Sequence, residues 1–317
     1  MGDKLPFLHQ HPIFSELLSQ LARSLAIDPY LIEKDYWLMH CLWGLQRQGW
    51  KFELKGGTSL TKGYGIIERF SEDIDIRFEP PVELDLKTGK NHNKPVHIDA
   101  RKAFFYWLAG QIVIPGLVGV TRATDFDDAS YRNGGITLDY PSVTQTLPGA
   151  KAGILLEVGF DVTAPNSPRT IRSWALDAAI NAKVAVFDNR AIDVPCYSPG
   201  YTLVEKLQTV STKFRKQQET ATFSKNFLRH YYDIYCLLGQ PEVQTFIGTP
   251  AYCAHKQSRF PKADNPHIAS NEAFRLTNPE VRALYERKYK ETAALYYTGQ
   301  IPFSAILERI GQYLDRL

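Results

Sequence analysis

The chain has 317 residues, of which 44% are hydrophobic and 22% charged, and is long enough for a substantial core in one large domain or in two. Its 37 basic and 34 acidic residues leave a formal net charge of only +3, so overall charge does not by itself demand a nucleic-acid partner. There is no run of about eighteen apolar residues, and the first residues lack the basic-then-apolar pattern of a signal peptide. We therefore expect a cytoplasmic protein without a membrane partner.

Apolar residues recur at helical spacing in two stretches near the start of the chain. The first lies within residues 12–25, and the second, residues 31–45, follows an Asp-Pro pair that is typical of a helix start. Lys34 and Asp35 belong to the second stretch. Because charged helix residues usually face solvent, the sequence favours a solvated helix face for both. It thus predicts an N-terminal region, residues 1–50, whose two helices pack on the core.

A glycine-rich turn follows at Gly56 and Gly57, with the hydroxyl-bearing Thr58 and Ser59 directly after it. Glycine lets the backbone approach a phosphate closely, and the two hydroxyls add donors where a helix would begin. On its own, a Gly-Gly pair is usually only a turn. We expect a short helix from Ser59 to about Gly65 to follow it.

An acidic strand is predicted next. Asp73 and Asp75 alternate with Ile74, Ile76 and Phe78, so a strand would place the carboxylates on one face and the apolar side chains on the other. Converging carboxylates suit a divalent metal, since Mg²⁺ takes few protein oxygens and completes its octahedron with water and substrate phosphates. The alternative is an ordinary solvated strand face. The pattern makes Asp73 and Asp75 candidate ligands of Mg²⁺, or of Mn²⁺ in its place.

In this order the two elements resemble the polymerase-beta-type nucleotidyltransferase signature. The sequence Gly-Gly-Thr-x-Leu … Arg-x-Ser-x-Asp-x-Asp resembles its AbiEii/AbiGii branch, the toxins of type IV toxin–antitoxin and phage-defence systems, over roughly residues 30–240. Lys34-Asp35-Tyr36 also resembles the Lys-Asp-Tyr entry that precedes the signature in this branch, which is the alternative to a solvated helix face. Residues 58–72, between the two elements, make the spacing longer than is common in that superfamily. The resemblance implies that Asp73 and Asp75 are catalytic and bind the metal. It implies nucleotide-binding roles for Gly56, Gly57, Thr58, Ser59, Arg69 and Ser71. For Arg69 and Ser71, which directly precede the carboxylates, bracing of the loop is the alternative.

Two later strands are predicted at residues 135–140 and 153–161, as an antiparallel pair. Polymerase-beta-type enzymes carry a third carboxylate on a later strand, so the resemblance implies a third metal ligand here. Glu157 and Asp161 share a face of the second strand. Glu157 is the better candidate, because a mid-strand carboxylate between apolar neighbours is costly unless it is paired or metal-bound. Asp161, at the strand end, has an ordinary explanation as a solvated terminus, and both remain candidates.

The last third of the chain is predicted to be helical. Residues 205–207 (Glu-Lys-Leu) and 229–233 (Arg-His-Tyr-Tyr-Asp) resemble the later motifs of the same toxins, which implies that Lys206 and Asp233 are catalytic and that Lys206 binds the nucleotide. A lysine suits the triphosphate of an NTP, and a carboxylate can hold that ammonium in position or accept a proton from the attacking hydroxyl. An ordinary interhelical ion pair is the alternative. His230 departs from the motif, so its role stays open.

Three other segments and the cysteines complete the sequence-based expectations. Residues 85–102 are polar and basic and suggest a mobile, solvated insertion. The basic residues 213–216 are expected between the two motif helices, where they would favour a polyanionic acceptor. Residues 280–297 read as one amphipathic helix. The four cysteines are expected to be buried, reduced thiols without a metal role: Cys41, Cys196, Cys236 and Cys253.

Together these features predict a mixed α/β (α+β) fold. Its polymerase-beta-like nucleotidyltransferase core would span residues 51–195, and a helical C-terminal domain, residues 196–317, would complete the active site. The expected function is Mg²⁺-dependent transfer of NMP from an NTP to an RNA (tRNA) end, by a toxin that a separate antitoxin protein holds in check. The alternatives are transfer to a small molecule or a protein hydroxyl, and a catalytically silent nucleotide-binding sensor.

Overall fold

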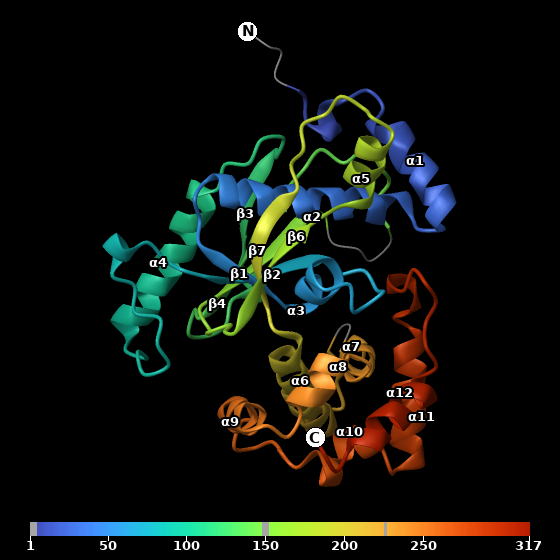
Figure 1. Cartoon of the computed structure of the whole chain (residues 1–317). Helices are drawn as coiled ribbons and strands as arrows, with labels where there is room; N and C mark the ends of the chain where they lie inside the picture. Colours follow the sequence, from blue (N-terminus) through green and yellow to red (C-terminus); the bar gives the residue numbers. More distant parts are fainter. Residues whose placement is uncertain (1–4, 148–151, 225–226) are drawn as a thin grey trace. The chain divides into compact units, whose positions relative to one another are not determined.

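The computed structural model describes residues 5–147, 152–224 and 227–317 (Figure 1). The chain forms two compact units. Unit 1 takes in the chain up to Tyr64 together with Ser71–Tyr197, and unit 2 consists of Gly65–Phe70 and Ser198–Leu317. The first four residues, on which the expectation about a signal peptide partly rests, lie outside the described ranges.

Unit 1 is built on a seven-stranded sheet with the strand order β3-β4-β5-β2-β1-β7-β6. The central β2 is parallel to β5 on one side and antiparallel to β1 on the other. The antiparallel pairing of β4 with β5 confirms the two strands predicted from residues 135–161. The strands are β1 (Phe52–Lys55), β2 (Asp73–Phe78), β3 (Gly119–Ala123), β4 (Asn133–Asp139), β5 (Ile154–Gly159), β6 (Asn166–Ile171) and β7 (Ala191–Tyr197).

Alternation along β2 gives its two faces different environments. Ile74, Ile76 and Phe78 are buried, and the Phe104 ring of α4 (Pro95–Gln111) packs against Phe78 with 5.9 Å between ring centroids. The opposite face carries Asp75, which is only half-buried. Because the side-chain period of a strand is two, Asp73 and Asp75 share this face, away from the apolar core.

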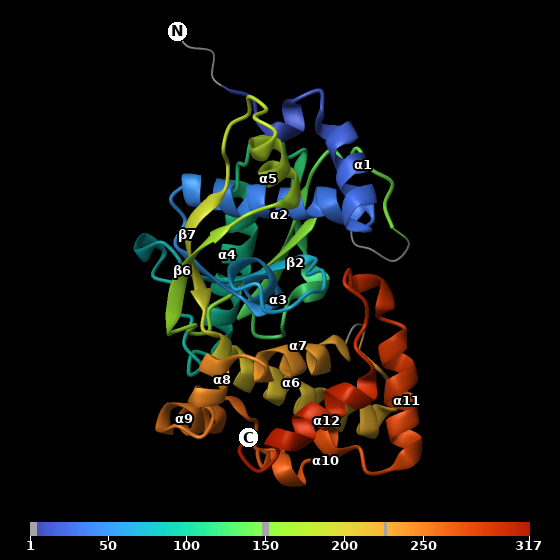
Figure 2. The same ribbon diagram turned by 45° about the vertical axis from the view of Figure 1, so that its right-hand side comes forward.

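Helix α2 (Pro29–Arg47) is buried on nearly all sides. Helices α1 (Phe14–Leu25) and α5 (Trp174–Asn181) and strand β7 contact it, and both views show it running across the sheet (Figures 1 and 2). The two predicted N-terminal helices are confirmed. The solvated face expected for Lys34 and Asp35 is wrong, because this surrounding packing leaves both side chains buried.

Unit 2 is helical (Figure 2). Its long helix α6 (Pro199–Thr220) contacts α7, α8, α9 and α10, and α12 contacts α7, α10 and α11. Tyr231 of α7 packs among the rings of Phe227, Tyr285 and Phe303, so aromatic side chains form much of the core. The other helices are α7 (Arg229–Leu238), α8 (Pro241–Phe246), α9 (Pro250–Arg259), α10 (Glu272–Arg275), α11 (Pro279–Lys290) and α12 (Phe303–Tyr313).

The predicted fold class is confirmed: N-terminal helices and a seven-stranded sheet form a mixed α/β unit, and the chain from Pro199 onward is helical. None of the helices in the described ranges is both long and apolar enough to span a membrane. The helix expected over residues 280–297 is shorter, since α11 ends at Lys290.

Three other expectations need correction. The basic residues 213–216 do not lie between helices, because α6 runs through them. The polar segment 85–102 is not all loop, because α4 begins at Pro95; the buried Arg101 also ties the preceding loop by donating to the Lys87 carbonyl at 2.7 Å. Of the cysteines, Cys236 is half-buried and Cys253 exposed, so only the other two are buried as expected.

Candidate active site

The acidic strand has a third carboxylate beside it in the sheet. β2 and β5 run in parallel with Asp75 directly opposite Glu157. Residues in register on neighbouring strands point to the same face, so Glu157 shares the face of Asp73 and Asp75. Asp161 lies beyond the end of β5. The structure therefore brings Glu157, and not Asp161, into register with the acidic strand.

Gly56 lies against the carboxylate of Asp75. Its φ of +68° falls in the left-handed region, which favours glycine. A Cβ built on Gly56 would stand 2.1 Å from Oδ2 of Asp75, far inside van der Waals contact. The glycine turn and the acidic strand are thus in direct contact, and any other residue at this position would have to displace the carboxylate.

The two hydroxyl residues after the glycines face into the fold. Thr58, at the end of the short α3 (Gly56–Thr58), is fully buried and donates its hydroxyl to the Asp73 carbonyl at 2.5 Å. Ser59 is also buried and lies beside the thiol of Cys196. A π-helical turn (Ser59–Gly63) continues from α3, where the sequence predicted a short helix. Thr58 therefore fastens the turn to the acidic strand, and the nucleotide-binding roles of both hydroxyls stay predictions.

The carboxylates on this face of the sheet are chemically suitable ligands for a divalent metal ion. Asp73, Asp75 and Glu157 offer carboxylate oxygens on one face of adjoining strands. Across the described ranges, no three or more His, Cys, Asp or Glu side chains are gathered so as to hold a metal ion. Mg²⁺ needs only one or two carboxylates when water and substrate phosphates supply the remaining oxygens. The Asp73–Asp75 pair fits that requirement, with Glu157 as an adjacent third carboxylate.

Lys55 is a further charged residue on this face, and our sequence reasoning did not single it out. It pairs in register with Asp75 across β1 and β2. Its Nζ lies 3.6 Å from the position that a Cβ on Gly159 would take, so the side chain extends over β2 towards β5. Its position in the sequence, directly before Gly56 and Gly57, is the signal that could have identified it as a candidate site residue. Its ammonium adds positive charge beside the carboxylates, where a phosphate group would need it.

Unit 2 holds a separate buried ionic cluster around Asp233. The guanidinium of Arg69 donates Nε to Oδ1 and Nη2 to Oδ2, both at 2.7 Å, in a bidentate pair. Lys206 approaches Oδ2 to 3.0 Å, so the Lys206–Asp233 pair considered from the sequence is present. Asp233 is fully buried, and Arg69 is 1% exposed. Arg69 therefore engages Asp233 in this structure, and its nucleotide-binding role stays a prediction.

The charge states in this cluster follow from burial and from its neighbours. Burial alone would raise the pKa of Asp233, but Arg69 and Lys206 hold that pKa well below its ordinary value. Burial and the nearby Lys206 lower the pKa of His230 well below its ordinary value. The His230 ring is therefore neutral at pH 7, with its Nδ1 3.3 Å from Nζ of Lys206. Asp233 is ionised and holds both cations.

The signature segment itself supplies Arg69 to unit 2. Gly65–Phe70 belongs to that unit, whereas Ser71, which is buried, belongs to unit 1. The Phe70 amide donates to the Leu295 carbonyl at 2.8 Å, and Arg69 forms a β-bridge with Tyr296. The structure thus assigns the predicted nucleotide-binding residues Arg69 and Ser71 to different units.

Comparison with known proteins gives a family match over most of the chain. The family described as "Nucleotidyl transferase AbiEii toxin, Type IV TA system" matches residues 40–309. No curated protein matches the chain. Among solved structures, an antigenic nucleotidyltransferase-like protein from Paracoccidioides brasiliensis is 13% identical, with 73% of this chain and 94% of that chain covered and a TM-score of 0.33.

Proposed function

We propose that this chain, which belongs to the AbiEii nucleotidyl transferase toxin family, transfers a nucleoside monophosphate with the acidic strand of unit 1. Membership makes it a nucleotidyltransferase that uses an NTP, in a family whose type IV toxin–antitoxin systems imply a cognate antitoxin partner. One observation carries the proposed site: Asp75 lies against Gly56 of the glycine turn and in register with Glu157. A phosphate-approaching turn and metal-binding carboxylates are the two parts that nucleotidyl transfer requires.

The residues of unit 1 would divide the work between metal and nucleotide. We assign Asp73 and Asp75 to Mg²⁺, or to Mn²⁺ in its place, with Glu157 as the third ligand. When bound, the metal neutralises phosphate charge and stabilises the attacking and leaving oxygens. The backbone of Gly56 and Gly57 would admit the β- and γ-phosphates at close range, because neither residue carries a side chain.

In unit 2, Lys206 is the residue we assign to the triphosphate. Its side chain is 10% exposed, whereas Asp233 behind it is fully buried. Arg69 and Lys206 keep Asp233 ionised, which makes it a poor acceptor of a proton. We therefore assign Asp233 the role of positioning Lys206. Arg69 then serves as the second counter-ion of Asp233, which keeps that carboxylate fixed.

An RNA end, such as that of tRNA, is the acceptor we propose. Exposed lysines stand around the start of α4, at Lys90, Lys94 and Lys102, and Lys216 is exposed on α6. Such side chains can neutralise the phosphates of a nucleic-acid backbone. Arg215 contributes less, because Asp264 accepts its Nε at 2.7 Å and compensates its charge.

Incubation of the purified protein with total RNA, Mg²⁺ and each labelled NTP in turn tests the proposal. We expect label in RNA with one or more of the NTPs, a steep loss of transfer as salt is added, and no transfer by Asp73→Asn. Label in a small molecule or in protein would reassign the acceptor. An absence of label with every NTP would contradict the transfer reaction, and a direct measurement of NTP binding would then test the silent nucleotide-binding module.

A matched pair of variants tests the third ligand. Glu157→Gln should lose activity, whereas Asp161→Asn, a change of the same kind just past the end of β5, should retain it. The reverse result would move the metal site along the chain. Growth inhibition on expression, relieved by the upstream gene, would test the toxin–antitoxin assignment, and its effect on phage infection would test a role in defence.

A further inference from the structure

Three consecutive charged residues of α2 are buried: Glu33, Lys34 and Asp35, with at most 1% of each exposed. Successive helix residues point about 100° apart, so the three side chains leave the helix in three directions. A buried charge is costly unless it is paired and hydrogen-bonded. Each of these side chains therefore needs a partner of its own, and the partners identify the segments of the chain that α2 keeps in position.

Lys34 is paired with the segment that leads into the acidic strand. Its Nζ lies 3.9 Å from Oε1 of Glu72, and the side chains are 0% and 8% exposed. The ammonium also lies 5.6 Å from the centroid of the Tyr30 ring. Glu72 directly precedes Asp73, the first carboxylate of the proposed site. The position of Glu72 is therefore coupled to α2 through a buried charge.

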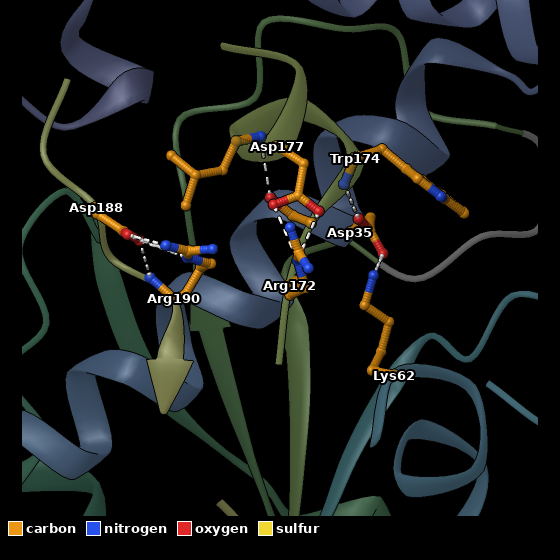
Figure 3. Close-up of polar contacts among 9 residues, drawn as sticks. Asp35, Lys62, Arg172, Trp174, Asp177, Asp188 and Arg190 are labelled. Carbon is orange, nitrogen blue, oxygen red and sulfur yellow. Dashed lines mark hydrogen bonds and ion pairs between the residues drawn. The ribbon is translucent and has the colours of Figure 1, made fainter. Parts of the chain in front are cut away.

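Asp35 is paired with the turn that follows the glycines. Its Oδ1 accepts from Nζ of Lys62 at 2.5 Å, and its Oδ2 accepts from the Trp174 amide at 3.0 Å (Figure 3). The Lys62 ammonium also lies 5.1 Å from the centroid of a Trp174 ring. Lys62 belongs to the π-helical turn that continues from Gly56. Asp35 thus fixes the glycine turn to α2 and to the start of α5.

Glu33 holds a segment outside the signature. Its carboxylate accepts the Val143 amide at 2.9 Å, the Thr144 amide at 3.1 Å and the Ser142 hydroxyl at 2.8 Å. These residues follow β4 and contain none of the proposed metal or nucleotide ligands. Like its two neighbours, Glu33 is a buried ionisable residue of α2, but the segment that it contacts is a different one. It is therefore a matched control.

We propose that Lys34 and Asp35 are positioning residues for nucleotidyl transfer. From adjacent places on α2, Lys34 holds the entry to the acidic strand and Asp35 holds the glycine turn. The contact between Gly56 and Asp75 requires the glycine turn and the acidic strand to keep a fixed spacing. This inference rests on the proposed function, because it assumes that the acidic strand binds the metal and the glycine turn binds the NTP. Groups that orient ligands in this way typically affect metal affinity or activity 10–100-fold.

A purely stabilising role explains these pairs less well. Buried ion pairs are weak contributors to stability, and well-packed hydrophobic replacements of similar volume are often neutral or stabilising. Here two such pairs start from adjacent helix residues. One pair leads to the acidic strand and the other to the glycine turn, so together they fix the position of these two segments relative to α2. A rigid helix is a suitable base for this, because its side chains have little freedom once they are buried.

The test compares Lys34→Met/Glu72→Gln and Asp35→Asn with the control Glu33→Gln, using the full chain. The double variant removes both charges of a pair, so that neither is left buried alone. The measurements are kcat and KM for the NTP, Mn²⁺ binding followed by the EPR signal of free Mn²⁺, and the melting temperature. We expect roughly 10–100-fold loss of kcat and weaker Mn²⁺ binding in both test variants, against wild-type kcat in Glu33→Gln.

The inference fails if either test variant melts as a folded protein and keeps the kcat and Mn²⁺ affinity of Glu33→Gln. It also fails if all three variants lose kcat equally in proportion to their loss of stability. Asp73→Asn separates this failure from that of the proposed function. If Asp73→Asn retains activity, the acidic strand is not the reacting site, and both conclusions fall.

Discussion

Replacing Asp233 by asparagine should strongly destabilise unit 2. Asp233 accepts two hydrogen bonds of 2.7 Å from Arg69 and pairs with Lys206 at 3.0 Å. The Arg69 side chain is 1% exposed, so its charge would stay buried once its counter-ion is neutral. Removing one partner of a buried ion pair typically costs about 3–5 kcal/mol for this reason. We expect a loss of that size in the free energy of unfolding at pH 7.

The pH dependence of this loss has a definite sign. Arg69 and Lys206 hold the pKa of Asp233 well below its ordinary value, against the effect of burial. A carboxylate with a lowered folded-state pKa stabilises the protein above its unfolded-state pKa of about 3.9, and this contribution is lost as the pH falls through the folded-state value. The difference between the wild type and Asp233→Asn should therefore be largest near neutral pH and shrink below about pH 4.

Urea unfolding followed by far-UV circular dichroism would measure the effect. The five tryptophans all lie in unit 1, so their fluorescence gives a separate signal for that unit. Double-mutant cycles with Arg69→Met and Lys206→Met should give the larger coupling to Arg69, because its pair is bidentate and more deeply buried. A loss below about 1 kcal/mol, or a larger coupling to Lys206, would refute this reasoning.

Two further predictions concern Gly56 and His40, which both belong to unit 1. Gly56→Ala should lower kcat because its Cβ must displace the Asp75 carboxylate 2.1 Å away, whereas Gly65→Ala, at a φ of +65° with no atom within 4 Å, should incur only backbone strain of about 1–2 kcal/mol. Equal kcat in the two folded variants would contradict a role for the Gly56 contact. Burial lowers the pKa of His40 from 6.5 to about 4, so the stability conferred by the neutral ring is complete above pH 6.5 and lost as the pH falls towards 4. At about 1.4 kcal/mol per pH unit the loss reaches about 2 kcal/mol at pH 5, and His40→Gln should flatten the change in urea midpoint between pH 7 and pH 5; an unaltered slope would argue against it.

Features that depend on local periodicity could be predicted from the sequence. The alternation of Asp73 and Asp75 with isoleucines indicated a strand with one acidic face, and β2 is that strand. Helical spacing identified α1 and α2, and apolar runs identified β4 and β5. The preference for Glu157 over Asp161 rested on its mid-strand position, which also places it in register with Asp75. In each case neighbours within a few residues decide the structure.

Features that depend on distant partners could not be predicted. Lys34 was expected on a solvated helix face, because its partner Glu72 lies in a distant segment of the chain, just before β2. Arg69 pairs with Asp233, 164 positions along the chain, and no local pattern marks that pair; its nucleotide-binding role stays a prediction. The edge strand β6 was missed because most of its residues are exposed and it contains a proline, so it has no apolar alternation. Tertiary contacts decide each of these, and a single sequence does not display them.

The length of the interval between the glycine turn and the acidic strand has a physical explanation in these contacts. Within residues 58–72 the chain leaves unit 1, contributes Gly65–Phe70 to unit 2 and returns. A shorter interval would remove Arg69 and leave the buried Asp233 with one cation fewer. The same segment that separates the two halves of the signature is therefore required by the helical unit.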